Sequence, residues 1–348
     1  MVKLGALGVC GELLDLFSDY LHGRCLSVVV NGHSSSAYNI AASVPQGSVL
    51  GPILWNIYLN DLLQILPSTF AYADDCTLYQ SFTRNEVPEV IETINHHLEN
   101  IVQWGRRWQV KFAAEKTQAM VISRSSYEVD ALQGKINFGD DTLQFEDDIN
   151  ILGVDFDNKL NFQKYIKETA RKTSLKINTL RRMKHLLDSK GLLTLYKAQV
   201  RSQLEYASLV WISSARSHLH LFDKVQRRAE RLISSTGQQE ATRNLDTLEH
   251  RRRVAAITVL HKAQIQHVPH LEGLRMPWRQ SQRSTRSVLA SDCQVEVPRS
   301  RTSLHQRTFA ASTSRLWNDI TTQIEVWGLT TQQVKLAAHS WCLLHPPD

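Results

Sequence analysis

The chain has 348 residues, of which 42% are hydrophobic, so it can fill the cores of two or three domains and is not a disordered polymer. A net charge of +6 and a pI near 9.0 are compatible with a polyanionic partner. Five scattered cysteines without a Cys-x-x-Cys pair argue against a disulfide framework or a cysteine-rich zinc module. We expect an intracellular protein, nuclear or cytoplasmic and not secreted. It should lack a membrane span, because no run of about 18 apolar residues occurs.

The first part of the chain predicts an α+β fold from its apolar spacing and turn residues. The predicted elements are a helix at residues 12–22, strands at 26–30 and 38–42, a Pro-Gln-Gly turn followed by a helix that Pro67 stops, a hairpin at 70–79, an amphipathic helix at 85–108 and a strand at 119–122.

The second part predicts a hairpin at residues 151–160 and three or four helices over 162–235. Between Lys159 and Arg201, twelve basic residues stand against two acids, which is a strong local positive charge. Residues 275–315 carry eight arginines and predict either a flexible basic arm or a poorly packed module. The final histidines and cysteine, His339, Cys342 and His345, form an incomplete ligand set, and we expect no metal site there.

The strongest local feature is the pair of carboxylates in Phe70-Ala-Tyr-Ala-Asp-Asp75. Like charges at a tight turn repel each other, and a hard divalent cation relieves that repulsion. Two such ions about 3.5–4 Å apart can activate a hydroxyl and stabilise a leaving phosphate, which is the chemistry of nucleotide polymerisation. The pair by itself is also compatible with an ordinary solvated turn.

A second motif, Pro45-Gln46-Gly47, precedes a predicted helix. Because Gly47 has no side chain, the backbone and the Gln46 amide can approach a ligand closely, and the helix N-terminus favours phosphate. A simple turn before a core helix is the alternative. The order and separation of the two motifs favour the functional interpretation.

Together these motifs resemble the reverse transcriptases of non-LTR (LINE-type) retrotransposons of the chicken-repeat-1 or jockey-like kind. Segments at residues 8–24, 28–32, 108–117 and 221–233 are also similar to that family. The resemblance implies a partial polymerase palm, an antiparallel sheet with helices, followed by a mostly α-helical thumb and C-terminal region. It implies an RNA-directed DNA polymerase that uses an RNA template, a DNA primer, deoxynucleoside triphosphates and Mg²⁺ or Mn²⁺ in a two-ion site.

The resemblance also assigns roles to single residues. Asp74 and Asp75 are expected as catalytic metal ligands. Lys116 matches a lysine that donates a proton to pyrophosphate, although a surface lysine fits its position equally well. The residues expected at the nucleotide are Pro45, Gln46, Gly47, Tyr72 and Ala73. Leu152 and Gly153 belong to a hairpin that grips the primer end.

The basic run is expected to follow the backbone of a nucleic-acid duplex, since each neutralised phosphate adds affinity. The residues expected to bind nucleic acid there are Lys172, Lys176, Arg181 and Arg182. A solvated helical face is the alternative, although such faces normally mix both signs of charge.

One family residue has no counterpart in the 348 residues. The resemblance places a further catalytic aspartate on a strand before residues 8–24, and Asp15 and Asp19 lie in a predicted helix instead. We therefore expect an N-terminally truncated reverse transcriptase whose polypeptide, taken alone, shows no primer extension with Mg²⁺ or Mn²⁺.

The expected organisation is a truncated palm at residues 1–165, a helical basic thumb-like region at 166–240 and a partly flexible, Arg-rich C-terminal region at 241–348. One alternative is a non-catalytic RNA- or DNA-binding protein derived from a retroelement. A group II intron maturase or telomerase relative is a weaker alternative, because residues after the expected thumb resemble the non-LTR family.

Overall fold

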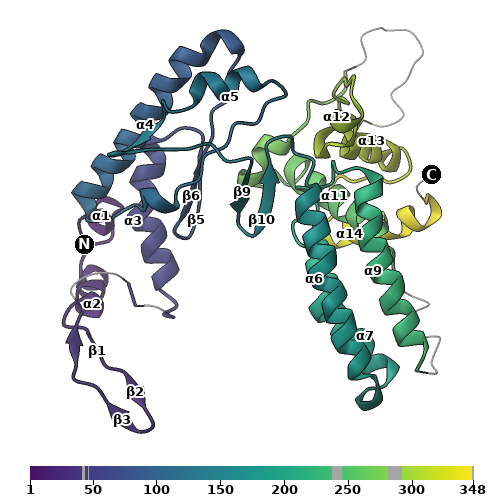
Figure 1. The fold of residues 1–348 in the computed structure, drawn as a ribbon, viewed down its shortest axis with the longest axis horizontal. Helices are drawn as coiled ribbons and strands as arrows, with labels where there is room; N and C mark the ends of the chain where they lie inside the picture. The colour runs from purple at the N-terminus through teal and green to yellow at the C-terminus, as the bar shows by residue number, and fades with distance from the viewer. Residues whose placement is uncertain (41–43, 46, 237–244, 281–291, 347–348) are drawn as a thin grey trace. The chain divides into compact units, whose positions relative to one another are not determined.

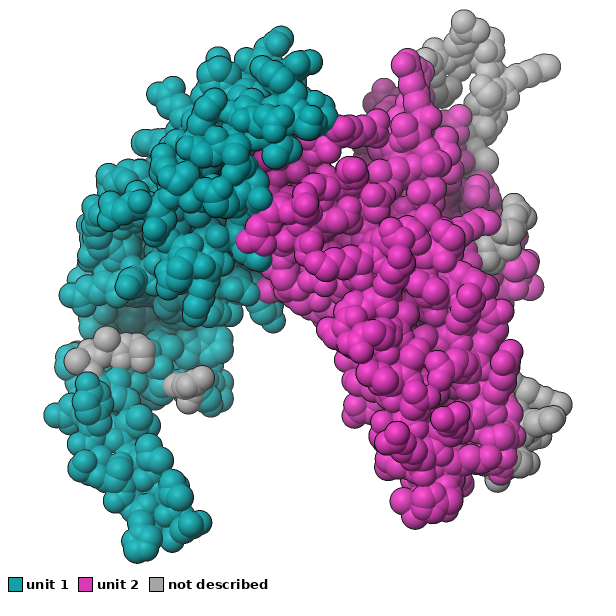
Figure 2. Space-filling view, in the orientation of Figure 1, with its two compact units in different colours: residues 1–119, 125–145 teal, residues 120–124, 146–348 magenta. Residues whose placement is uncertain are grey.

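The computed structural model describes residues 1–40, 44–45, 47–236, 245–280 and 292–346. The chain divides into two compact units, one formed by residues 1–119 and 125–145, the other by residues 120–124 and 146–348 (Figure 2). Helices dominate both units, and every sheet among the described residues is antiparallel and two-stranded (Figure 1). The expected mixture of helices and antiparallel strands is thus confirmed.

Unit 1 contains most of the predicted elements of the first half. Its helices are α1 (Val2–Ala6), α2 (Glu12–Leu21), α3 (Gly51–Ile65), α4 (Val87–Trp108) and α5 (Ser126–Leu132), with short 3₁₀ turns η1 (Arg84–Glu86) and η2 (Ala114–Lys116). Its strands are β1 (Cys25–Leu26), β2 (Val29–Val30), β3 (His33–Ser34), β4 (Tyr38–Asn39), β5 (Thr69–Tyr72), β6 (Asp75–Leu78), β7 (Asn137–Phe138) and β8 (Asp141–Thr142).

Two predicted strands of unit 1 differ from the structure. The single strand expected at 26–30 is instead β1, paired with β4, and β2, paired with β3, and all of these strand residues are exposed. The strand expected at 119–122 is wrong, because only an isolated bridge from Ala119 to Phe145 forms there. The apolar pattern there reflects the burial of Val121 instead. Residues 41–42 of the strand expected at 38–42 lie outside the described residues.

A largely shielded ammonium group, that of Lys3, holds the C-terminal half of α3. The Lys3 Nζ lies 3.9 Å from the ring centre of Trp108, 4.4 Å from that of Tyr58 and 4.6 Å from that of Trp104. It also donates to the Asp61 carboxylate at 2.7 Å, and the Trp104 indole N–H donates to the same oxygen at 3.0 Å. Cation–π contacts and a shared carboxylate thereby tie α1, α3 and α4 together.

Unit 2 begins with the second predicted hairpin and continues as helices. Its elements are β9 (Asp148–Ile151), β10 (Val154–Asp157), α6 (Gln163–Arg182), η3 (Lys184–Leu186), α7 (Ser189–Leu195), the π-helical η4 (Tyr196–Arg201), α8 (Ser202–Glu205), α9 (Arg216–Ser234), α11 (Leu248–Gln264), η5 (Pro269–Leu274), α12 (Ser303–Arg307), α13 (Phe309–Thr321) and α14 (Thr331–Leu344). The hairpin and the helices expected over 162–235 are confirmed.

Two hydrophobic clusters fill unit 2, and α11 contributes to both. Leu248 packs with α6, η4 and α9 around the fully buried Trp211, while Ile257 and Leu260 pack with α13 and α14 around the fully buried Trp317. The expectation of a flexible or poorly packed segment is wrong for residues 292–298 and 303–315, since Val295 and Ala311 are completely buried. Residues 281–291 of that segment lie outside the described residues.

No helix in the described part of the chain is both long and apolar enough to cross a lipid bilayer.

The ion pair between Lys3 and Asp61 should make the stability of unit 1 depend on pH. Burial opposes ionisation, but hydrogen bonds from Lys3 and Trp104 outweigh it and lower the pKa of the Asp61 carboxyl below 3.8. Because the folded pKa is depressed, the ionised carboxylate stabilises the fold above about pH 4, and this contribution is lost as the pH falls through the folded pKa. We expect Asp61→Asn to reduce the free energy of unfolding at pH 7, and to reduce it progressively less as the pH falls below about 4, measured by urea denaturation. In a Lys3→Met background, the effect of Asp61→Asn on the free energy of unfolding should depend less on pH. An effect of Asp61→Asn that is the same at neutral and at low pH would contradict the role of the Asp61 carboxylate.

Candidate functional site

The Pro-Gln-Gly motif forms a turn that leads into α3. The Ser48 N–H donates to the Pro45 carbonyl at 3.3 Å, and the Ser48 hydroxyl accepts from the Gly51 N–H at 2.9 Å, which satisfies one free amide of the helix start. Gly47 has φ of +79°, and a Cβ built on it would meet nothing within 4 Å. The expected open glycine therefore lies at this turn, while Gln46 is outside the described residues.

Gly51 has a different role from Gly47. A Cβ at Gly51 would lie 3.0 Å from the Ser48 hydroxyl and 3.2 Å from the Pro45 carbonyl oxygen, so a larger residue would push the turn away from the helix. The turn is therefore packed directly against the first residues of α3.

The acidic motif forms the tip of the β5–β6 hairpin. Tyr72 pairs with Asp75, so Ala73 and Asp74 are the two turn residues, and Ala73 has a left-handed φ of +54°. Both carboxylates are exposed, and Tyr72 is 70% exposed beside them. Partial burial, followed by the charges of Asp75 and Asp74, raises the pKa of the Cys76 thiol. The thiol is therefore kept uncharged next to the acidic pair.

A tryptophan joins the two motifs. The indole N–H of Trp55, in the second turn of α3, donates to the Ala73 carbonyl at 2.6 Å. Ala73 is the hairpin turn residue just before Asp74. The helix that starts at the Pro-Gln-Gly turn thus contacts the tip of the acidic hairpin. The sequence contains no motif signal for Trp55, because its role depends on a contact between elements distant in the chain.

The hairpin tip offers a donor set that suits a hard divalent cation. Two adjacent carboxylates supply oxygen ligands, and among the described residues neither forms an ion pair with a lysine, arginine or histidine. A cation with a preference for oxygen would relieve their mutual repulsion.

Lys116 ends the short 3₁₀ turn η2, and its side chain is exposed. Within the described ranges, no hydrogen bond or ion pair that the structure records joins Lys116 to the hairpin. Its proposed role in proton donation therefore stays a prediction.

The second hairpin, in unit 2, has Leu152 and Gly153 at its turn, with φ of +49° and +80°. The Tyr206 hydroxyl donates to the Leu152 carbonyl at 2.7 Å, and the Gly153 N–H donates to the Asn150 side chain at 3.1 Å. Leu152 is 44% exposed, so the turn presents an apolar side chain at a rigid position.

The basic residues expected to bind nucleic acid lie along α6. Lys172 lies 3.8 Å from Glu168 in an ion pair, and Lys176 donates to the Gln199 carbonyl at 3.1 Å, whereas Arg181 and Arg182 are exposed at the last helical turn. The positive charge that is available to a partner is therefore concentrated at the C-terminal end of the helix.

A second helix adds to this charge. Arg181 of α6 lines a surface pocket of about 230 Å³ together with Arg228 and Arg231 of α9, and Arg228 donates to the Asn178 side chain at 3.0 Å. The two α9 arginines were not predicted, because the basic run was counted along the chain and ended at Arg201. Their helical spacing on α9 was the available signal.

Comparisons with known proteins agree with these motifs. Residues 2–156 match the family described as reverse transcriptase (RNA-dependent DNA polymerase). The matched segment contains both motifs and is similar to that family. The chain is 27% identical over 249 residues to the RNA-directed DNA polymerase from mobile element jockey of Drosophila funebris, covering 68% of this chain and 26% of that protein.

Two further relatives are of the same type. One is the probable RNA-directed DNA polymerase from transposon X-element of Drosophila melanogaster, 25% identical over 63% of this chain and 24% of the relative. The other is a Pol polyprotein from the type-1 retrotransposable element R1 2 of Nasonia vitripennis, 30% identical over 40% of this chain and 35% of the relative. The non-LTR, LINE-type assignment of the reverse transcriptase segment is thereby confirmed.

The chain spans about a quarter of the length of the jockey and X-element proteins. No solved structure matches the chain.

The Trp55 hydrogen bond should stabilise the reverse transcriptase hairpin locally. Trp55→Phe removes the donor to the Ala73 carbonyl and retains an aromatic ring, so we expect a loss of about 0.5–1.5 kcal/mol in the free energy of unfolding. Amide exchange should become faster in residues 69–78 and stay unchanged in α4. Trp327→Phe, on a half-exposed tryptophan of unit 2, is the matched control. Unchanged exchange in the hairpin would show that the contact does not hold it.

Proposed function

We propose that the chain contributes the nucleotide-binding and primer-binding parts of an RNA-directed DNA polymerase of a non-LTR retrotransposon. The contact between Trp55 and the Ala73 carbonyl carries this proposal, because it brings the Pro-Gln-Gly helix and the acidic hairpin together within a segment of the reverse transcriptase family. In this proposal residues 1–165 are part of a palm, residues 166–240 a thumb, and residues 241–348 a C-terminal region.

Asp74 and Asp75 would hold Mg²⁺ or Mn²⁺. When bound, such ions supply charge neutralisation and alignment for attack of a primer hydroxyl on a nucleotide phosphate. The nucleotide would lie against Tyr72 and Ala73 and against Pro45 and Gly47, and Gln46 is proposed to contact it as well. The open glycine, the exposed Tyr72 ring and the contact between α3 and the hairpin support this placement. Lys116 is the proposed proton donor.

Unit 2 would bind the template–primer duplex. The rigid turn at Leu152 and Gly153 would contact the primer end. The basic residues Lys172, Lys176, Arg181 and Arg182, extended by Arg228 and Arg231, would contact phosphates. This second activity does not require the metal site, so a non-catalytic nucleic-acid-binding protein would keep it.

Metal binding at the acidic hairpin can be tested with Mn²⁺ alone. The full chain should bind Mn²⁺, followed by its electron paramagnetic resonance signal, and the double variant Asp74→Asn, Asp75→Asn should lose at least about tenfold in affinity, since both carboxylate ligands lose their charge. The chain offers a matched control in Asp140 and Asp141, an adjacent acidic pair at the exposed β7–β8 turn. An equal loss in the Asp140→Asn, Asp141→Asn variant would show that any exposed acidic pair suffices.

Duplex binding by unit 2 can be tested through its salt dependence. Arg181→Gln combined with Arg228→Gln should weaken binding to an RNA–DNA duplex, and the slope of log affinity against log salt should fall by about two, because each lost phosphate contact removes about 0.9. Fluorescence anisotropy from 50 to 200 mM salt, as an approximate range, measures both quantities.

Lys335→Gln, an exposed lysine on α14, changes the net charge by one and serves as the control. If Lys335→Gln lowers the slope of log affinity against log salt as much per removed charge as the two arginine changes do, then the net positive charge of the chain, rather than the arginine pocket, explains duplex binding.

A further inference from the structure

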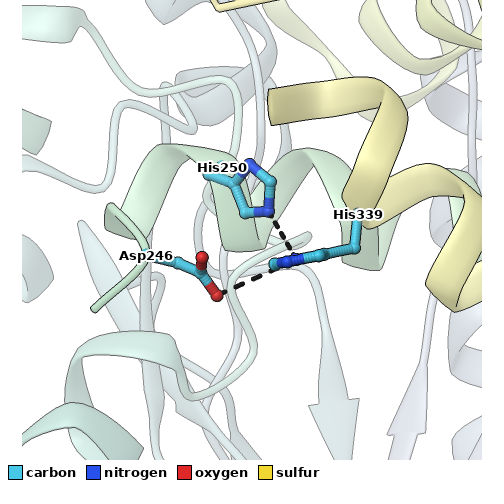
Figure 3. A group of neighbouring side chains, drawn as sticks. All are labelled: Asp246, His250 and His339. Atoms are coloured by element: carbon cyan, nitrogen blue, oxygen red, sulfur yellow. Dashed lines mark hydrogen bonds and ion pairs between the residues drawn. The ribbon is translucent and has the colours of Figure 1, made fainter. Parts of the chain in front are cut away.

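Three potential metal ligands converge in unit 2, whereas the acidic hairpin belongs to unit 1. Asp246 precedes α11, His250 lies in its first turn, and His339 lies on α14 (Figure 3). The His250 Nε2 lies 2.8 Å from the His339 Nδ1, which lies 3.9 Å from an Asp246 carboxylate oxygen. One ligand atom from each residue lies within 4.8 Å of the other two.

The fold fixes the positions of these side chains. Thr247 caps α11 by accepting from the His250 N–H at 3.1 Å, and the Asp246 carbonyl accepts from Gln226 of α9 at 3.1 Å. The His250 and His339 rings meet edge to face, with centres 4.7 Å apart. Helices α11 and α14 carry the two histidines, and Gln226 of α9 holds the backbone of Asp246 in the segment just before α11.

The geometry points to a binding site for a divalent transition metal of the Zn²⁺ kind, with His250 Nε2, His339 Nδ1 and the Asp246 carboxylate as ligands. Metal–ligand bonds of 2.0–2.2 Å at tetrahedral angles require ligand atoms about 3.3–3.6 Å apart. Two of the three separations, 2.8 and 3.9 Å, lie on either side of that range, and the third is within 4.8 Å, so side-chain rotations would bring the Asp246 carboxylate closer to the two histidines. Two imidazoles and one carboxylate suit Zn²⁺ better than Mg²⁺.

The surroundings leave a fourth coordination position open. Arg251 lies 4.0 Å from the Asp246 carboxylate and is also paired with Glu205, which offsets the positive charge of Arg251 there. The side chain of His339 is 40% exposed, so water can reach the remaining coordination position.

A metal bound there would connect the start of α11 to the middle of α14. Because the ligands come together only in the folded chain, the binding free energy would add to the stability of unit 2. The inference is independent of the proposed polymerase function.

The test uses Zn²⁺ and the full chain carrying Asp74→Asn and Asp75→Asn, so that the acidic hairpin does not contribute. After removal of metal with a chelator, competition with a chromophoric chelator measures affinity and stoichiometry. We expect one equivalent of Zn²⁺, a visible absorption band of tetrahedral geometry with Co²⁺, and a rise in Tm on adding Zn²⁺. His339→Gln should lose at least about tenfold in affinity together with the Co²⁺ band and the rise in Tm.

Two further variants keep the result interpretable. Asp246→Asn should weaken binding in the same way, and it leaves the buried His250 in place if His339→Gln misfolds. His345→Gln is the matched control, because His345 ends the same helix, stacks on Trp341 and lies outside the ligand group. Absence of saturable Zn²⁺ binding, or an equal loss in the His345 variant, would mean that the three residues are only a hydrogen-bonded group.

Discussion

Helix α3 is the element on which the candidate polymerase site depends. Its first turn is capped by Ser48 of the Pro-Gln-Gly turn, its second turn contacts the hairpin tip through Trp55, and Asp61 joins it to Lys3 and Trp104. The paired ammonium lies against three aromatic rings and is largely shielded from water. An orientation of α3 that separated Asp61 from Lys3 would leave each charge without its partner, so the ion pair favours one orientation of α3. The position of both motifs depends on that orientation, because one precedes α3 and the other contacts it through Trp55.

Elements with a local code could be predicted from the sequence, whereas long-range contacts could not. The helix at 87–108 has apolar residues at helical spacing, and the hairpin at 69–78 has strand formers on both sides of a turn. The open space at Gly47 and the exposed carboxylates are also local properties. The contact of Trp55 with Ala73, by contrast, depends on how α3 packs, and no spacing in the sequence reports it. The apolar run at 119–122 misled the prediction because burial of a single side chain does not require a strand.

The segment from α11 onward escaped prediction for a related reason. Helix α11 serves two hydrophobic clusters, so it is buried on several sides and has no single apolar face. Its buried residues include Arg252, 6% exposed, and the fully buried His261. Such residues make the segment look polar in the sequence, although they lie in a packed interior. The contribution of the α9 arginines was missed because it also depends on packing. Arg228 and Arg231 lie beside Arg181 of α6 only in the folded chain.

The buried polar residues of α11 also bear on the histidine group at its start. Burial lowers the pKa of Arg252, and its Nη1 has no hydrogen-bond partner among the described residues, so this helix carries a local desolvation cost. Asp246 and His250 are four residues apart, but His339 is 89 residues from His250, so no compact ligand spacing in the sequence points to the three residues together. Metal–ligand bonds at this end of α11 would offset that cost by holding the helix against α14. The polar character of α11 would then have a physical basis, because a helix anchored at its first turn can tolerate buried polar side chains farther along.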